Sequence, residues 1–543
     1  MASLTRAALL ALFLPTLPAL AGDDGSAEET NTLDRLDQDD LEFQKQKQRG
    51  FRIEGLKTEF SFDMEWHEVS NLDFRALDEE TDQLILDSDD RTGLAFTGIG
   101  MKLQYRVDEK VDFVMGASHR GLWGTDQIGS TNGIGGWVYF TSLYMDYHPN
   151  GENGIKVRVG RQPYEIGGIA GTRDFVLADI NDMVLVEIPI GDIGTLQVIP
   201  IDLVSSSPGG DDVNFMAYVA RRGGSEINYR GDNRTTRHGV VFELDKEELP
   251  VQAKVYGFFT DVGAGGLTYK GTTGTGADMT YAGTLGNFTD KDWVVNTGLR
   301  VQAEFGVVRP YGQLNVSTGI DRKEQVARDV DTNGMSFGGG VVIDTIEDGK
   351  GFKGKVAYYE AMGAAYGTDG MQFSHGYVGM KGRHIGGLIA NRYLGWHPSS
   401  YVSWAGISQD AHEPARKAGT RLIEAQAGME GLGPFSVRGT FLFMQDTGVT
   451  FLDMEQLDTI DPPYGYSRAE FDAERRMGET LGEEIDIEIW YEASSKLDLN
   501  LSGGIMLPGN FYGIPVARVA GTQLGSFDPQ TPWVLSAGSH LRF

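Results

Sequence analysis

The sequence predicts an all-β protein, a transmembrane antiparallel β-barrel of about 18 strands, with 16 and 20 as the neighbouring even numbers. Three observations predict it. The 543-residue chain opens on an export signal, its segments beyond residue 49 alternate apolar and polar side chains, and its last segment ends on the aromatic Phe543. Its 74 glycines argue against a mainly helical protein, because glycine costs about 1 kcal/mol at each helical position.

The first 49 residues divide into two segments that precede the barrel. Residues 1–21 carry Arg6, an apolar run over 7–20 and an A-x-A-like site at 19–21, which is the layout of a signal peptide. The alternative, a membrane anchor, is too short and too proline-rich to span ~30 Å. Residues 22–49 are acidic and poor in apolar residues, so we expect disorder, with a lumen plug or docking segment as the alternative. The barrel then occupies residues 50–543.

Alternation with a period of two is the main structural signal beyond residue 49. It is clearest in 99–107, 295–305, 485–491 and 497–505. A strand of this kind has one apolar and one polar face. A β-sandwich or β-helix would turn the apolar face inward, whereas an outer-membrane barrel turns it toward lipid and keeps the polar face toward the lumen.

The lengths of the connections favour the barrel. Short links at 107–111, 305–308 and 491–497 alternate with long polar ones such as 261–292 and 446–480, and short periplasmic turns with long extracellular loops are typical of outer-membrane barrels. About twenty segments read as strands, among them 212–221, 375–383 and 386–393. A barrel of this width leaves an aqueous lumen unless loops fold into it, so the architecture predicts passage of a solute.

The C-terminus predicts where the protein resides. Trp533, Leu535, Ala537, Leu541 and Phe543 share one face of the last segment. This ending resembles the strand by which bacterial outer-membrane barrels are recognised for insertion; the alternative is an ordinary edge strand. The resemblance implies a multi-pass barrel in a Gram-negative outer membrane, in contact with lipid bilayer, lipopolysaccharide and the barrel-assembly machinery.

Charge and composition exclude several classes of function. The net charge of −30 is unsuited to nucleic acid, which binds basic surfaces. The chain has no cysteine and nine histidines, and no zinc-protease, nucleophile-elbow or Walker pattern occurs. We therefore expect no enzyme and no catalytic residue.

Cations on the polar faces of the strands are the candidate pore-lining residues. Rings of Arg and Lys in a pore attract anions. The alternative is that they pair with inward acids such as Glu304, Asp344, Glu424, Asp486 and Glu488. The cations are Lys102, Arg106, Lys156, Arg158, Lys254, Arg300, Arg309 and Arg438.

The segment 157–162, Val-Arg-Val-Gly-Arg-Gln, is followed by Pro-Tyr-Glu at 163–165 and later by Arg173-Asp174. A strand that ends in Gly-Arg-Gln before a long loop able to fold inward resembles the alginate-export family of outer-membrane barrels. The resemblance implies a basic conduit for an acidic polysaccharide, lined by Arg158, Arg161 and Arg173, with periplasmic export partners. Arg161 has the apolar parity of its strand, so it lines the pore only if the strand has ended there.

One segment has the beginning of a calcium loop. Asp329, Asp331 and Asn333 stand in a D-x-D-x-N-G pattern, but Gly340 stands where the bidentate glutamate would be. The alternative is a tight Asn-Gly hairpin turn. Calcium in an external loop is therefore the one cofactor the sequence suggests.

Three functions remain open after the sequence alone. The first is a channel that passes anionic solutes or an acidic polysaccharide through a basic lumen. The second is a general or substrate-specific diffusion porin, and the third is a structural outer-membrane anchor without transport.

Overall fold

The computed structural model describes a large part of the chain beyond residue 54. The described residues are 55–71, 91–122, 138–151, 154–166, 176–203, 235–244, 250–262, 270–272, 278–280, 292–321, 330–347, 349–363, 365–366, 372–374, 376–380, 385–393, 419–447, 480–509, 518–519, 522–523 and 530–543. The predicted signal peptide, the acidic segment 22–49, the candidate strand 212–221, Arg173 and Asp329 lie outside them.

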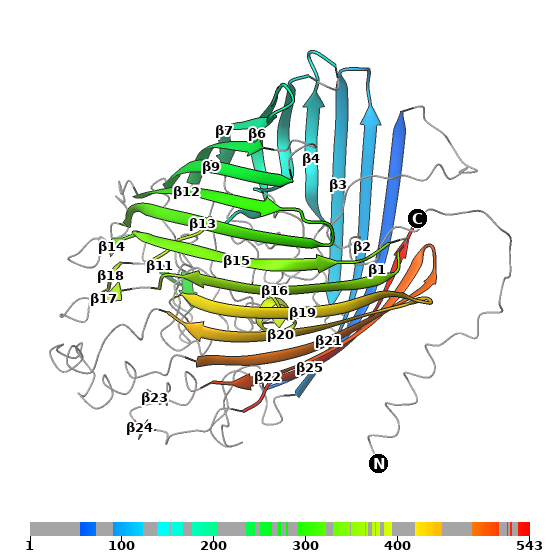
Figure 1. Cartoon of the computed structure of the whole chain (residues 1–543), viewed down its shortest axis with the longest axis vertical. Helices are drawn as coiled ribbons and strands as arrows, with labels where there is room; N and C mark the ends of the chain where they lie inside the picture. The colour runs from blue at the N-terminus through cyan, green and yellow to red at the C-terminus, as the bar shows by residue number, and fades with distance from the viewer. Residues whose placement is uncertain are drawn as a thin grey trace.

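Eighteen antiparallel strands close into one barrel (Figure 1). Each pairs with the next strand of the wall in chain order, and the first and last strands close the ring by pairing from Ser61–Arg542 to Ser70–Trp533. The wall consists of β1 (Leu56–Ser70), β2 (Arg91–Arg106), β3 (Val111–Leu122), β4 (Val138–Tyr147), β5 (Lys156–Glu165), β6 (Ala178–Ile190), β7 (Gly194–Leu203), β8 (Thr235–Leu244), β9 (Val251–Val262), β12 (Asp292–Ala303), β13 (Val308–Asp321), β15 (Gly334–Asp344), β16 (Gly351–Ala361), β19 (Thr420–Leu432), β20 (Phe435–Asp446), β21 (Thr480–Ser494), β22 (Leu497–Pro508) and β25 (Trp533–Arg542). The prediction of an 18-stranded barrel is confirmed.

Short strands lie beside this wall. Three of them join the main sheet: β14 (Val330–Asp331), β17 (Ala365–Tyr366) and β18 (Gln372–Ser374). Two further pairs form separate hairpins: β10 (Lys270–Thr272) with β11 (Asp278–Thr280), and β23 (Arg518–Val519) with β24 (Thr522–Gln523). In the described part of the chain, no helix is both long and apolar enough to cross a membrane.

The two ends of the barrel differ in their connections, as predicted. Short turns such as 107–110, 191–193 and 495–496 lie at one end, and connections such as 263–291 and 447–479 lie at the other. Both ends of the wall meet on the short-turn side, where Phe543 and Phe60 exchange backbone hydrogen bonds. The strands of the near and far walls cross at a large angle in Figure 1, because strands tilt when a sheet closes.

The two faces of the wall have opposite chemistry. On β21, Ile485 and Ile487 point outward and are exposed, whereas Glu484 and Asp486 point inward and are buried. Aromatic residues line the outer face near the short turns, among them Phe435 and Tyr491 with ring centroids 4.9 Å apart. An outward apolar band with aromatic girdles is the surface that lipid requires. The chain is therefore a multi-pass β-barrel of the bacterial outer membrane.

Two predicted strands are not part of the wall. The described parts of 375–383 and 386–393 run inside the barrel, where Ile389–Tyr393 forms a single π-helical turn, η2. Gly376 and Gly387 have φ of 70° and 88°, a left-handed backbone that interrupts an extended strand. The apolar residues of this stretch resemble those of a strand, but they pack on the inner wall instead of facing lipid.

The outward position of Ile487 predicts a depth-dependent effect of charge. Ile487→Arg should lower the free energy of unfolding in lipid vesicles by about 2–4 kcal/mol, because Ile487 lies mid-strand in the apolar band. Phe435→Arg, outward at the short-turn end of the neighbouring strand, should cost about 0–1 kcal/mol. Denaturant titration of both variants measures the difference, and equal costs would contradict this assignment of the lipid-facing band.

Candidate functional site

A segment of the β16–β19 connection enters the barrel and binds the inner wall at several points. We call the described residues 376–380 and 385–393 the crossing segment. Its first anchor lies on β8, β12 and β13. Arg237 Nη1 donates to the carbonyl of Met380 at 2.7 Å, and Asn296 Nδ2 donates to the carbonyl of Val378 at 2.6 Å. The amide of Val378 donates to Ser317 Oγ at 3.0 Å.

The second anchor is a pair of buried carboxylates on β21. Glu484 accepts from the amides of Ile389 and Ala390 at 2.6 and 2.9 Å, and Asp486 accepts from the amide of Leu388 at 3.0 Å. The two acids share a face because they are two residues apart in a strand. They satisfy amides at the start of η2, which have no acceptor within that turn.

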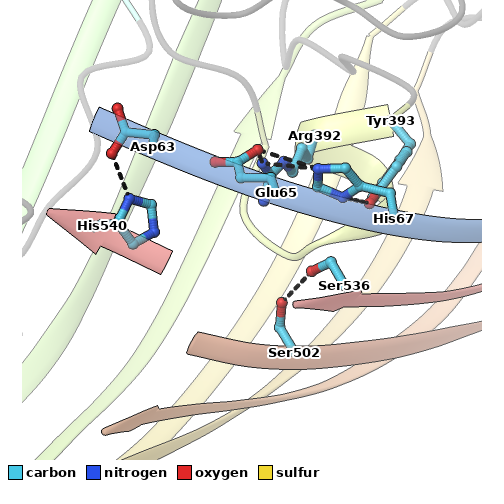
Figure 2. A network of polar contacts seen from close by, with 8 residues as sticks. All are labelled: Asp63, Glu65, His67, Arg392, Tyr393, Ser502, Ser536 and His540. Carbon is cyan, nitrogen blue, oxygen red and sulfur yellow. Dashed lines mark hydrogen bonds and ion pairs between the residues drawn. The ribbon is translucent and has the colours of Figure 1, made fainter. Parts of the chain in front are cut away.

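The third anchor lies on β1, where polar side chains meet the end of the crossing segment (Figure 2). Arg392 forms an ion pair with Glu65. The Tyr393 hydroxyl lies 2.6 Å from His67 Nδ1, and His67 Nε2 lies 3.1 Å from Glu65. Glu65 therefore holds both the arginine of the segment and the ring of the histidine.

The first and third anchors lie on opposite sides of the barrel. In the order of pairing, eight wall strands separate β1 from β12 in either direction. The crossing segment thus reaches from one wall to the other and narrows the lumen. It also meets the β5–β6 connection, since the amide of Met380 donates to the carbonyl of Val176 at 2.9 Å. Lys254 on β9 donates to the carbonyl of Ile166 in the same connection at 3.2 Å.

Apolar side chains fill the space between the wall and these inner segments. They form two clusters, one around η2 and one around the β5–β6 connection. The first contains Val69, Tyr359, Ala361, Tyr377, Ile385, Leu388, Ile389, Ala390, Tyr393, Leu422, Leu442, Met444, Leu481, Met506 and Val534. The second contains Tyr164, Ile166, Val176, Leu177, Met183, Leu185, Ile199, Val241, Tyr256, Phe258 and Met380. The wall covered by these segments is therefore apolar between the polar anchors.

Elsewhere the inner wall carries cross-strand ion pairs. Arg158 on β5 binds Asp146 on β4 through two hydrogen bonds of 2.6 and 2.8 Å, and Lys355 lies 2.9 Å from Glu424. The same pairing occurs for Arg106–Asp112, Lys156–Glu187, Lys254–Glu243, Arg309–Glu304, Arg309–Asp344 and Arg438–Glu488. The predicted alternative of pairing with inward acids thus describes much of this wall. Arg300 and Lys102 have the inward parity of their strands, and Arg300 is buried.

Arg161 lies on the opposite face from Arg158. Strand β5 continues to Glu165, so the parity of Arg161 holds and its side chain faces outward. There its Nε and Nη2 donate to the two carboxylate oxygens of Asp182 on β6, at 2.9 and 2.8 Å. The structure therefore separates the two arginines that the sequence placed together in the pore.

The candidate calcium ligands are only partly described. Asp331 lies on β14, which bridges to Ser374 of β18. The amide oxygen of Asn333 accepts a hydrogen bond of 2.7 Å from Thr318. Within the described residues, no group of three His, Cys, Asp or Glu side chains is placed to hold a metal ion.

A serine pair and two histidines lie near one another on the inner wall (Figure 2). Ser502 and Ser536 are 2.6 Å apart, and Ser536 is opposite His67 in the register of β1 and β25. A serine nucleophile needs a base within hydrogen-bond reach. The two ring nitrogens of His67 instead contact Tyr393 and Glu65. His540 contacts Asp63 at 2.8 Å. These contacts tie strands and the crossing segment together.

The residues that anchor the crossing segment were missed by sequence reasoning, except for Asp486, which it named as an inward acid. Glu65, His67, Arg392 and Tyr393 carry no motif. For Glu484 a signal was available in the alternation of the strand, because Glu484, Asp486 and Glu488 occupy successive inward positions of β21. The partner of these acids, a loop entering the lumen, has no local signature.

The closed wall and the lipid-facing band define the class: an outer-membrane β-barrel, with a segment of its own chain inside it. No family model matches the chain, and no curated protein matches it. Among solved structures it is similar to the outer membrane protein OprD from Pseudomonas aeruginosa, with 10% identity over 92% of this chain and 96% of that one and a TM-score of 0.42. It is also similar to OccAB2 from Acinetobacter baumannii, with 9% identity over 90% and 99% and a TM-score of 0.45.

A third similar structure is a BenF-like porin from Pseudomonas fluorescens Pf-5, with 8% identity over 90% of this chain and 100% of that one and a TM-score of 0.43. The resemblance to the alginate-export family is wrong, because no family model supports it and the similar structures are porins. Its residue pattern also fails, since Arg161 faces away from the lumen.

The carboxylate anchor predicts how the crossing segment can be released. Glu484→Ala should leave the amides of Ile389 and Ala390 without an acceptor, at a cost of about 1–3 kcal/mol for each buried donor. We expect the open-channel current in a planar bilayer to become larger and noisier as the segment detaches. Glu483→Ala removes the same side chain from the outer face of β21 and should leave the current unchanged; equal behaviour of the two variants would count against the anchor.

Proposed function

We propose that the chain is a diffusion porin that admits small polar solutes through a lumen narrowed by the crossing segment. The observation that carries the proposal is the anchoring of this segment to β12 and to β1 on the opposite wall. A segment held at both sides divides the cross-section of the lumen. Small solutes can pass such a constriction more readily than a long polymer chain.

Ion pairing on the inner wall supports weak rather than strong ion selectivity. The cations from which the sequence predicted a basic lumen mostly stand beside acids, as Arg158 does beside Asp146 and Arg438 beside Glu488. A paired wall presents both signs of charge to a solute and concentrates neither ion strongly. Preference for anions stays the second candidate, supported by the number of inward cations and weakened by their partners.

The experiment is single-channel recording of the refolded mature chain in planar bilayers. We expect discrete conductance steps and a reversal potential close to zero in a KCl gradient, as for a weakly selective pore. Polymers that a wide conduit would admit should be excluded. A strongly anion-selective current blocked by uronate polymers would instead favour the anionic conduit. Folded, inserted protein without any conductance would favour the structural anchor.

Two arginines on one strand provide a matched test of the wall assignment. Arg158→Ala should leave the carboxylate of Asp146 on the inner wall without its bidentate partner, so the reversal potential should shift toward cation preference. Arg161→Ala removes the same side chain from the outer face and should leave the reversal potential unchanged. A shift in both variants, or in neither, would contradict the proposed lining.

A further inference from the structure

One polar pair of the inner wall lies open to the lumen at the seam where β25 closes against β1. His540 Nδ1 on β25 is 2.8 Å from Asp63 Oδ1 on β1 (Figure 2). The two residues are direct neighbours in the register of these strands, and their side chains are 28% and 36% exposed. We call His540 and Asp63 the seam pair.

The seam pair lies beside the edge of the crossing segment. On β1, His67 and Glu65 hold the segment, and their side chains are only 4% and 12% exposed. Asp63 is the next inward residue of the strand, because inward residues are two positions apart. On β25, Ser536 is buried, whereas His540 is open. The segment therefore covers the seam as far as Glu65, and the seam pair faces the passage that the segment leaves.

The acid of the seam pair has an unusual partner for this wall. Elsewhere the inward acids face arginine or lysine, as Asp146 faces Arg158 and Glu424 faces Lys355. Arginine and lysine side chains stay positive from pH 5 to pH 8, whereas an imidazole changes its charge in this range. The pairs with arginine or lysine thus keep a constant charge, and the charge of the seam pair depends on pH.

A second carboxyl group faces His540 from the other neighbouring strand. Asp498 on β22 is opposite His540 in register, and in the described part of the chain no lysine or arginine forms an ion pair with it. Glu492 on β21 and Arg542 on β25 flank the group and have opposite charges. Farther along β1, Glu65 has Arg392 as its partner. The imidazole is therefore the group that decides how negative the seam is.

We propose that His540 sets the ionic preference of the passage beside the crossing segment through the charge of its imidazole. A protonated imidazole neutralises one of the two carboxylates that face it. As the pH rises and the imidazole loses its proton, the wall becomes more negative and attracts cations. The inference rests on the proposed porin function and assigns to that pore a residue that determines its selectivity.

The test is the reversal potential of single channels in a KCl gradient, recorded at about pH 5 and pH 8 with the full mature chain. His540→Gln fixes the position as neutral, and His540→Lys fixes it as positive. Two control histidines are replaced by glutamine: His148, whose Nε2 lies 3.8 Å from Asp112 just beyond the end of β4, and His238, which is exposed on the outer face. Heat-modifiable mobility in gels establishes that each variant is folded.

We expect the cation preference of the unchanged chain and of both control variants to rise between the two pH values. His540→Gln should match the unchanged chain at the higher pH and keep that preference at the lower one. His540→Lys should match the unchanged chain at the lower pH and keep that preference at the higher one. Each variant by itself distinguishes the proposal, so failure of one to fold leaves the other decisive.

A full pH-dependent rise in either folded His540 variant would overturn the proposal while leaving the porin function intact. Loss of the rise in the His148→Gln variant alone would assign the effect to the mouth of the barrel and would likewise overturn it. Folded, inserted protein without conductance at either pH would overturn the porin function and this inference together.

Discussion

The structure depends on the closure of β1 against β25. In the hydrocarbon of a bilayer every backbone amide and carbonyl needs a partner within the protein, and an open edge would leave a row of them unpaired. The pairing that runs from Ser61–Arg542 to Ser70–Trp533 removes both edges at once. A closed ring of this size then dictates a wide interior, and the inner segments and paired charges respond to that interior.

The chain deals with its wide interior in two ways. Where the crossing segment and the β5–β6 connection lie, apolar residues of the inner wall such as Leu442 and Met444 pack in a core around the polar anchors. Elsewhere the wall stays polar, and acids and bases on neighbouring strands neutralise one another. Glu484 and Asp486 mark the boundary, because they lie on the polar parity of β21 but their carboxyl oxygens accept hydrogen bonds from amides of the crossing segment. Strand β21 therefore faces lipid with its outer side chains, and its inner side chains contact the crossing segment at one end and the polar lumen farther along.

How far the sequence predicts this protein depends on the range over which each signal acts. Alternation along 485–491 is local, so the strand and its outward face could be predicted before any partner was known. The segments 375–383 and 386–393 are equally strand-like locally, yet their described residues lie inside the barrel, because their burial comes from contacts with strands such as β12 and β21 far along the chain. The partner of Glu65 is Arg392, hundreds of residues away, and no spacing rule connects them.

The positions of Arg158 and Arg161 show why the number of cations in the strands does not define the lining of a pore. Both arginines belong to β5, and each makes a two-point contact with an aspartate of an adjacent strand. A separation of three residues puts them on opposite faces, so Arg158 faces the lumen and Arg161 faces outward. The same guanidinium–carboxylate pair thus lies on the inner wall in one place and on the outer wall in the other. Strand parity, and the residue at which the strand ends, must be fixed before a cation can be assigned a role.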